Sequence, residues 1–221
     1  MINLKILKLK LFQETACYKK PFAFKVAESY PLPPYSTVIG MFHKILGAGS
    51  NEYHPMDISV QGEYESIFSN YQNLRMFKGK EQVTAMPRNV HQLLNVNLVI
   101  HMKSDDETVE KIYENIINGK ETFTLGRNED LVRVDEVKII EEPKKVYDRF
   151  INKYNAYVPV ELTDEEVSGI NYRLNTVYTV KNDLRQWHKV DVKYIEKNTQ
   201  ESLLELLQDE EEDYIYWCEC R

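Results

Sequence analysis

The strongest restriction on the fold comes from a helical pattern that lies between two strand patterns. Apolar residues alternate with mostly polar ones over residues 94–102, which is typical of a half-buried strand. Ser104 and Glu107 then form a capping box, an apolar stripe with helical spacing follows, and Gly119 predicts the end of this helix. Residues 131–140 are rich in β-branched side chains and predict a further strand.

The first part of the chain predicts the same kinds of element. Residues 2–12 alternate between polar and apolar, with a phase change near Ile6 and Leu7 that indicates a β-bulge. Residues 57–64 predict another strand.

A helix is predicted between these two strands. Pro34 cannot continue a helix from upstream, so it marks a start, and Ser36 or Thr37 can cap the free amide groups. Gly47 supplies the stop.

The resulting order over residues 1–140 is β-α-β-β-α-β, which predicts an α+β domain of the ferredoxin-like or RNA-recognition-like type. Residues 65–92 form a long insertion between the middle strands, and long connections in compact domains are usually functional or disordered. Residues 141–221 predict a smaller β-rich region with an acidic segment. This region includes a strand at residues 190–194 and a short helix at residues 203–207.

Charge is unevenly distributed along the chain. The net charge is −7, and residues 196–221 account for all of it, with nine acidic residues and two basic ones. Residues 1–50 hold seven lysines and two acidic residues. This asymmetry suits a protein that binds a phosphate backbone on a positive face while another protein covers the rest, and a solvated surface with chance asymmetry explains it equally well. Charge therefore permits an RNA partner without requiring one.

The compartment follows from what the sequence lacks. No apolar run approaches the roughly 18 residues that a membrane-spanning helix needs. The amino terminus alternates lysine with aliphatic residues, unlike a secretory signal, and the three cysteines cannot all pair with one another. We therefore expect a cytoplasmic protein that does not contact a membrane.

Motifs for cofactors and metals are also absent. The sequence has no Walker A motif, no dinucleotide-binding glycine motif, no zinc-protease motif and no nucleophile elbow. Cys218 and Cys220 could bind a soft metal, yet the alternation around them favours the end of a strand. Acidic residues 209–213 could hold a hard cation, yet a run of charge is usually a solvated turn. The sequence therefore predicts no metal and no cofactor.

Metal-independent RNA cleavage is the best catalytic candidate. It needs a base for the 2′-hydroxyl, an acid for the leaving oxygen and a cation for the developing charge. Tyr18, Lys19 and His43 supply these residue types. However, His43 falls on the polar flank of an amphipathic helix, where a histidine needs no special explanation. We expect a protein that is not an enzyme and retain cleavage as the alternative.

The sequence offers better material for RNA binding. Residues 17–25 interleave aromatic side chains, which stack on splayed bases, with lysines, which meet phosphates. The alternative is a surface loop whose aromatic side chains pack back onto the core. The start of the first helix presents amide groups that can hold a phosphate. The consensus of standard RNA-recognition modules is absent. The candidate RNA-binding residues in this part are Tyr18, Lys19, Lys20, Lys25, Ser36 and Thr37.

Two segments resemble signatures of a known family. Residues 30–40, Tyr-Pro-Leu-Pro-Pro-Tyr-Ser-Thr-Val-Ile-Gly, resemble the proline-rich turn and helix start near the amino terminus of the fifth Cas protein family. Residues 125–131, Leu-Gly-Arg-Asn-Glu-Asp-Leu, resemble its second signature, a short glycine-containing loop after the second helix. Their order and spacing extend the resemblance over residues 1–140. The tyrosine-rich carboxy-terminal part is most similar to type I-B members.

The resemblance implies a non-catalytic subunit of a type I CRISPR surveillance complex (Cascade) in antiviral defence. Members of the family have a ferredoxin-like core and a thumb-like β insertion. They hold the 5′ handle of the CRISPR RNA and contact the large subunit and the backbone subunits; target DNA within the complex is a further partner to consider. By this resemblance residues 65–92 are the thumb, and the cationic residues that would run along the RNA are Arg75, Lys78, Lys80, Arg88 and His91.

The resemblance also gives meaning to two glycines. Gly40 lies inside a predicted helix, where it costs about 1 kcal/mol relative to alanine; close approach of a partner and tight helix–sheet packing explain it equally well. Gly126 predicts a left-handed or close-approach turn. Arg127, the last candidate RNA-binding residue, is free to reach a phosphate or to pair with Asp130.

Two other readings stay open. One branch of the family, in type I-C systems, cuts its precursor RNA, so a metal-independent endoribonuclease that processes CRISPR RNA is the alternative function. An unrelated ferredoxin-like interaction domain would keep the fold and lose the RNA.

Overall fold

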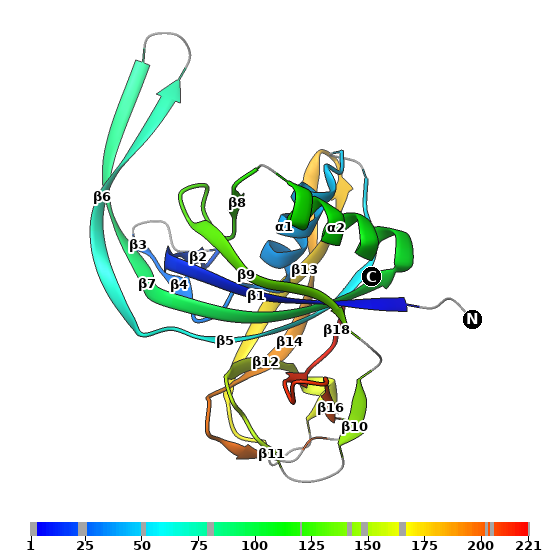
Figure 1. Ribbon diagram of the computed structural model, residues 1–221. Helices are drawn as coiled ribbons and strands as arrows, with labels where there is room; N and C mark the ends of the chain where they lie inside the picture. Colours follow the sequence, from blue (N-terminus) through cyan, green and yellow to red (C-terminus); the bar gives the residue numbers. More distant parts are fainter. Residues whose placement is uncertain are drawn as a thin grey trace.

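The computed structural model shows a strand-rich molecule with two α-helices among the residues it describes (Figure 1). The fold is therefore richer in β-structure than the predicted α+β class. The described residues are 4–21, 26–49, 52–78, 82–119, 121–140, 143–146, 150–163, 167–201, 203 and 206–220.

The predicted strand and helix order is present, and it builds the centre of the main sheet. In this sheet β5, β7, β1 and β9 lie side by side in that order, and each pairs antiparallel with its neighbour. Both helices lie on one face of these strands (Figure 1). The bounds are β1 Leu4–Ala16, α1 Tyr35–Leu46, β5 Met56–Glu63, β7 Gln82–Asp105, α2 Asp106–Asn118 and β9 Leu131–Ile140.

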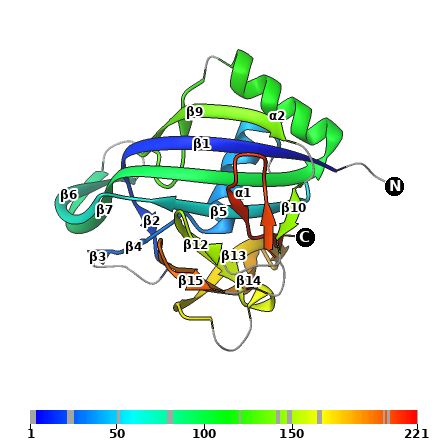
Figure 2. The ribbon, with the colours of Figure 1, turned by 60° about the horizontal axis from the view of Figure 1, so that its bottom comes forward.

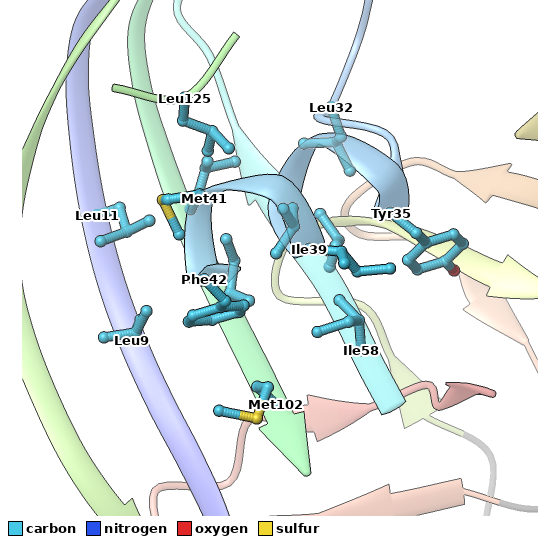
Figure 3. Close-up of a cluster of buried hydrophobic side chains, with 14 of the residues drawn as sticks. Leu9, Leu11, Leu32, Tyr35, Ile39, Met41, Phe42, Ile58, Met102 and Leu125 are labelled. Atoms are coloured by element: carbon cyan, nitrogen blue, oxygen red, sulfur yellow. The ribbon is translucent and has the colours of Figure 1, made fainter. Parts of the chain in front are cut away.

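The core forms where α1 packs on the sheet. Figure 3 shows Phe42 and Met41 of α1 pointing toward Leu9 and Leu11 of β1. All four side chains are buried, because the helix lays its apolar face on the alternating apolar residues of the strands. Leu32, Tyr35, Ile39, Ile58, Met102 and Leu125 belong to the same cluster.

Strand β1 is buried on both faces near its start, and this explains the phase change in its sequence. Leu7 and Leu9 belong to the cluster under the helices, whereas Ile6 packs with Ile140 and Ile215 on the opposite side. The register shift in the pairing of β1 with β9 lies at Lys10 and Leu11. The predicted bulge at residues 6 and 7 is therefore misplaced. Consecutive apolar residues occur there because both faces of the strand are buried, and they produce the same phase change in the sequence as a bulge.

The helix ends are partly as predicted. Gly47 follows α1 with φ +70°, which confirms the left-handed stop. Pro34 precedes the first helical residue and no side chain caps this end, so the predicted cap by Ser36 or Thr37 is wrong. Asp105 caps α2: its Oδ1 accepts from the Thr108 amide at 2.9 Å. The predicted capping residue Ser104 instead donates to the Pro55 carbonyl at 2.7 Å.

The insertion is a long two-stranded ribbon. Strand β6, Ser66–Lys78, pairs antiparallel with the first half of β7, from Ser66 opposite Leu94 to Lys78 opposite Gln82. In Figure 1 it projects far beyond the rest of the sheet. We call residues 66–78 and 82–94 the thumb ribbon. A regular ladder of backbone hydrogen bonds thus orders a segment whose length alone suggested a loop.

The carboxy-terminal part continues the main sheet. Strand β12, Asn155–Pro159, pairs with β5. Strand β14, Leu184–Ile195, pairs with β12, and β13, Ile170–Lys181, pairs with β14 at the edge of the sheet. The strand predicted at residues 190–194 is confirmed within β14. The short helix predicted at residues 203–207 is wrong, because Leu206 and Leu207 lie in β16 and Leu203 forms a β-bridge with Thr163.

The remaining short elements complete the chain. Strand β18 pairs with β5, which confirms the predicted strand end at Cys218 and Cys220. Among the described residues, no helix has the length and apolar character required to cross a membrane. The short elements are β2 Tyr18–Lys19, β3 Val26–Ala27, β4 Ser29–Tyr30, β8 Phe123–Thr124, β10 Lys144–Val146, β11 Phe150–Ile151, η1 Val160–Leu162, β15 Gln200–Glu201, β16 Leu206–Gln208, β17 Tyr214–Ile215 and β18 Cys218–Cys220.

Candidate nucleic-acid interface

The sheet face opposite the helices is closed by the chain itself. Residues 209–213, which we call the acidic turn, lie in the carboxy-terminal segment that crosses this face in Figure 2. Lys8 of β1 points into the turn: its Nζ lies 2.5 Å from Asp209 Oδ2, 2.6 Å from Asp213 Oδ2 and 2.8 Å from Glu211 Oε2. The Lys8 and Asp209 side chains are both fully buried. RNA-recognition modules bind RNA on such a sheet face, and here that face is occupied.

This arrangement corrects two expectations. The acidic run is not a wholly solvated turn, because Asp209 and Asp213 are buried. The lysine-rich amino-terminal part is not a free cationic surface either, because Glu211 also pairs with Lys10 at 2.8 Å and with Lys138. Opposite charges that are far apart in the sequence therefore neutralise one another inside the molecule.

The pKa values of the acidic turn follow from these contacts. Burial by itself would raise the pKa of Asp209, but hydrogen bonds from His101 and Lys8 outweigh it and hold this pKa well below its usual value. Hydrogen bonds from Lys10, Lys138 and Lys8 lower the pKa of Glu211. Burial opposes the charge of Lys8, yet its three acidic partners raise its pKa overall. Lys8, Asp209 and Glu211 therefore stay charged at neutral pH.

A different surface brings together three of the segments selected from the sequence. Asp130, fully buried, accepts hydrogen bonds through Oδ2 from the Cys17 amide at 3.0 Å and from the Arg127 amide at 2.8 Å. Gln13 donates to the carbonyls of Leu125 and Asp130 at 2.9 and 3.2 Å. The glycine-containing loop is thereby fixed to the end of β1 and to the segment that follows it.

The same loop is tied to the root of the thumb ribbon. Arg127 Nη1 donates to Gln72 Oε1 at 3.2 Å, and Gln72 and Asn70 donate to Gln92 Oε1 at 3.4 and 2.8 Å. We call this junction, formed by residues 17–20, 125–130, 70–72 and 88–92, the thumb base. The contact between Arg127 and Gln72 joins positions that are 55 apart in the sequence.

Arg127 has a mainly structural place in this junction. Its guanidinium binds both oxygens of Asp130, with the shortest contact at 2.7 Å, and lies 3.1 Å from Glu129 Oε1. Burial opposes its charge, but the hydrogen bonds to Asp130 raise its pKa overall. Only 17% of the side chain is exposed. Of the two roles predicted for Arg127, the pairing with Asp130 is the one present.

Gly126 is required by the geometry of the loop. Its φ is +108°, and an added Cβ would lie 2.8 Å from Asp130 Oδ2 and 3.2 Å from the Cys17 carbonyl. The prediction of a close-approach turn is confirmed. Gly40, in contrast, is exposed and a Cβ there would meet no described atom of this chain within 4 Å, so tight helix–sheet packing does not explain it.

Tyr18 does not offer a ring for stacking. It is 1% exposed, its hydroxyl donates to Gln13 Oε1 at 2.6 Å, and burial raises its pKa well above the usual value. The alternative reading, in which an aromatic side chain of this segment packs onto the core, is correct for this residue. Its neighbour Lys19 is exposed, and Lys20 pairs with Glu28 at 3.3 Å. Lys25 lies outside the described residues.

The thumb ribbon carries cations and unexpectedly many exposed apolar side chains. Arg75 is exposed, and Arg88 and His91 are half-buried. The side chain of Lys78 and the whole of Lys80 lie outside the described residues. The apolar residues are visible in the sequence of the same segment, but only its charges were predicted to have a function. The exposed ones are Ile67, Phe68, Tyr71, Leu74, Met76, Phe77, Val83 and Met86.

The start of α1 is less suited to a phosphate than predicted. The amide groups of Thr37 and Val38 donate to the Pro34 carbonyl at 2.9 and 3.3 Å, so they already have partners. Ser36 and Thr37 are half-buried.

The ring of His43 is fully engaged within the chain. Its Nδ1 bonds to the Ile39 carbonyl at 2.9 Å, and its Nε2 accepts from the His54 amide at 3.0 Å. These partners select the tautomer that is protonated at Nδ1, and burial lowers the pKa of the ring. The ring also stacks on Tyr53 at a centroid distance of 5.5 Å. Among the described contacts, no residue touches both His43 and Tyr18, so these contacts do not link two of the residues predicted for RNA cleavage.

The described part of the chain also contains no group of three or more histidine, cysteine or acidic side chains suited to a metal ion. Cys218 and Cys220 are buried free thiols with sulfur atoms 3.5 Å apart. Cys17 is buried as well.

Comparisons with known proteins place the chain in a family. The model of the family described as "CRISPR-associated protein (Cas_Cas5)" matches residues 6–198. A solved chain described as "CRISPR RNA-guided surveillance complex" is 12% identical with a TM-score of 0.57, and the match covers 89% of this chain and 91% of that one. Another, "Crystal structure of a CRISPR protein from Archaeoglobus fulgidus", is 10% identical with a TM-score of 0.54 and coverage of 99% and 100%.

At these identities the likeness to the solved chains is one of fold. No curated protein matches the chain significantly. The family model, however, spans the chain from β1 to beyond β14 and includes the thumb ribbon, the glycine-containing loop and the thumb base. The chain therefore belongs to the CRISPR-associated Cas_Cas5 family.

Proposed function

We propose that this chain is a non-catalytic, RNA-holding subunit of a CRISPR effector complex, and that the thumb base and thumb ribbon hold the 5′ handle of the CRISPR RNA. The observation that carries the proposal is the convergence at the thumb base. Asp130 and Arg127 connect the glycine-containing loop to the end of β1 and to Gln72 of the ribbon. Three distant segments are thereby held in one rigid arrangement, which is what precise positioning of a single RNA strand requires.

The surface around this junction has suitable chemistry. Lys19 is exposed within the thumb base, and Arg75 is exposed farther along the ribbon. Tyr71 and Phe77 are 69% and 76% exposed, so their rings are available for stacking on unpaired bases. Cations that meet phosphates and aromatic rings that meet bases are the combination that binds single-stranded RNA. The sheet face opposite the helices is covered by the acidic turn, whose carboxylates pair with Lys8. This supports the proposal that RNA binds on the side of the thumb ribbon.

The proposal includes a ferredoxin-like core and protein partners. The antiparallel order β9-β1-β7-β5, with α1 and α2 on one face, supports the proposal of a ferredoxin-like core. The exposed apolar side chains of the thumb ribbon suit contacts with other proteins, for which we propose the backbone subunits and the large subunit of the complex. A type I-B-like complex is the expected setting.

The deciding experiment incubates the purified full-length protein with its cognate repeat RNA in EDTA and reads binding and cleavage in one gel at two salt concentrations. Binding of the processed handle that weakens with salt, without cleavage, is the expected result, because phosphate contacts release counterions. An RNA of the same length and scrambled sequence is the matched control.

Cleavage in EDTA that disappears in a His43→Ala variant would make the protein a metal-independent endoribonuclease and refute the non-catalytic assignment. We expect no cleavage, since both ring nitrogens of His43 already bond within the chain.

A further inference from the structure

A second ribbon extends from the opposite end of the main sheet. Strand β14 pairs with β12 only over Val192–Ile195, so in the described pairings its first residues have β13 as their sole neighbour. In Figure 1 this hairpin and the thumb ribbon both extend toward the top of the view. We call residues 178–189 the tip ribbon. It lies outside every segment selected from the sequence for RNA binding.

The tip ribbon is ordered by a tight turn. Asn182 and Asp183 have φ values of +52° and +57°, and Lys181 pairs directly with Leu184. Two consecutive left-handed residues in a two-residue loop form the turn whose twist matches that of paired strands. The turn therefore fixes the register of the two strands, which sets the face of the ribbon from which each side chain emerges.

One face of the tip ribbon presents aromatic rings and a guanidinium. Tyr178 pairs with Trp187, and their ring centroids lie 5.0 Å apart at 61°. Arg185 places its guanidinium carbon 4.4 Å from the centre of the Tyr178 ring. Because Val180 pairs with Arg185, these four side chains share one face of the ribbon. Trp187 is 37% exposed.

The charge of this region is opposite to that of the whole chain. Lys181, Arg185 and Lys189 are exposed, and none of the three forms an ion pair within the described residues. Asp183 is the acidic residue of the turn. This surplus of positive charge contrasts with the lysines of β1, whose charges are neutralised by the acidic turn.

We propose that the tip ribbon is a second nucleic-acid contact, which binds a single strand by stacking a base against Trp187 and by pairing phosphates with Arg185 and Lys189. The combination of an exposed indole, a guanidinium held in place by Tyr178 and unpaired lysines is the chemistry of a single-strand platform. Such contacts tolerate any base, so this site differs in kind from one that reads a defined handle. It does not depend on the thumb base.

The exposed aliphatic side chains Val180 and Leu184 are the features that a protein partner would cover instead. The charge decides between the occupants. A polyanion satisfies Arg185 and Lys189, which share the face of Trp187 and have no ion-pair partner among the described residues, whereas an apolar protein surface would leave these cations buried without partners.

The test uses the fluorescence of Trp187 in the full-length protein. The chain has two tryptophans, so a Trp217→Phe variant leaves Trp187 as the only reporter. Titration with oligothymidylate of 15 nucleotides at low salt should quench its emission saturably, and raised salt should weaken the binding. In separate binding assays, Trp187→Ala should weaken binding of this oligonucleotide about tenfold, as the loss of one stacked base predicts. Arg185→Glu should weaken binding as well, because it replaces a phosphate-pairing cation with a negative charge.

Two controls keep this proposal separate from handle binding. Arg75→Glu on the thumb ribbon should leave the quenching of Trp187 unchanged, and Trp187→Phe should retain most of the oligonucleotide affinity because a ring remains. Emission of Trp187 that stays constant throughout the titration would overturn the proposal even if the repeat RNA binds tightly elsewhere. Equal affinity of the wild type and of Trp187→Ala for the oligonucleotide would overturn it as well.

Discussion

Lys8 and Asp209 lie 201 positions apart in the sequence, yet the Lys8 Nζ is 2.5 Å from Asp209 Oδ2 and neither side chain is exposed. This contact joins the first strand to the carboxy-terminal acidic turn. Lys8 and Lys10 pair with acidic residues of the same chain, so these amino-terminal lysines are not available to RNA although the net charge of the chain is −7.

We expect Lys8→Met to lower the free energy of unfolding by about 3–5 kcal/mol, because it leaves Asp209 and Asp213 buried without their cation. Lys10→Met is the matched control, since the Lys10 side chain is 34% exposed and its pairs should be worth less than about 1 kcal/mol. Urea unfolding of the two variants measures both values. Similar losses in the two would show that the burial of Lys8 has no energetic importance.

Stability should fall with acidification because of the same cluster. The pKa values of Asp209 and Glu211 are lower in the folded protein than in the unfolded chain. Such groups contribute stability that is present above their unfolded-state pKa, near 4, and is lost as the pH falls through the folded-state pKa. Burial also lowers the pKa of His101, and this histidine acts in the same direction below pH 6.5 or so.

Urea unfolding at pH 7, 5 and 4 measures this effect. The decline below about pH 5 should be shallower in Asp209→Asn than in the wild type, because the variant lacks one depressed carboxyl. Glu210→Gln, at an exposed position of the same turn, should keep the wild-type pH dependence. A wild-type decline in Asp209→Asn would place the acid sensitivity elsewhere in the protein.

Two glycines should respond to alanine with opposite signs. Gly126→Ala should destabilise the protein by about 1–3 kcal/mol, because φ is +108° and the new Cβ would crowd Asp130. Gly40→Ala should stabilise it by about 0.5–1 kcal/mol, because the position is helical and open. Thermal unfolding of both variants provides the measurement. Destabilisation by Gly40→Ala would mean that an unseen constraint acts on α1.

Arg75→Gln should weaken binding of the repeat RNA and reduce the slope of log K against log salt by about 0.7, the value for one phosphate contact to a single strand. Lys111→Gln is the matched control, because Lys111 is an exposed cation on α2, away from the thumb ribbon. Binding isotherms at several salt concentrations separate the two. An equal change of slope in both variants would show that binding follows total charge and not the position of Arg75.

Local patterns were sufficient for the elements that carry their own signal. The strand at residues 131–140, the helix of residues 106–118 and the left-handed stop at Gly47 were all predicted closely, because periodicity and glycine conformations act over a few residues. The two signature segments, at residues 30–40 and 125–131, indicated the family that the family model then matched.

The candidate site was only partly predictable. The cations of the thumb ribbon and Gly126 were identified from the sequence. The burial of Tyr18 was only the alternative to base stacking, because it depends on Gln13 and on the glycine-containing loop, which approach only in the folded chain. The tip ribbon was missed because its turn, Asn182-Asp183, is unremarkable as a dipeptide until both residues adopt left-handed conformations.

The sequence by itself determined the order of the main strands and helices over residues 1–140 and the family to which the chain belongs. The tertiary structure alone decided which charges are neutralised, which sheet face is closed and which segments meet at the thumb base. The physical reason is the separation in sequence between the residues that interact. Secondary structure is set by neighbours within one or two turns, whereas the pairing of Lys8 with Asp209 and the fixing of Arg127 against Gln72 depend on distances that exist only after the sheet has assembled.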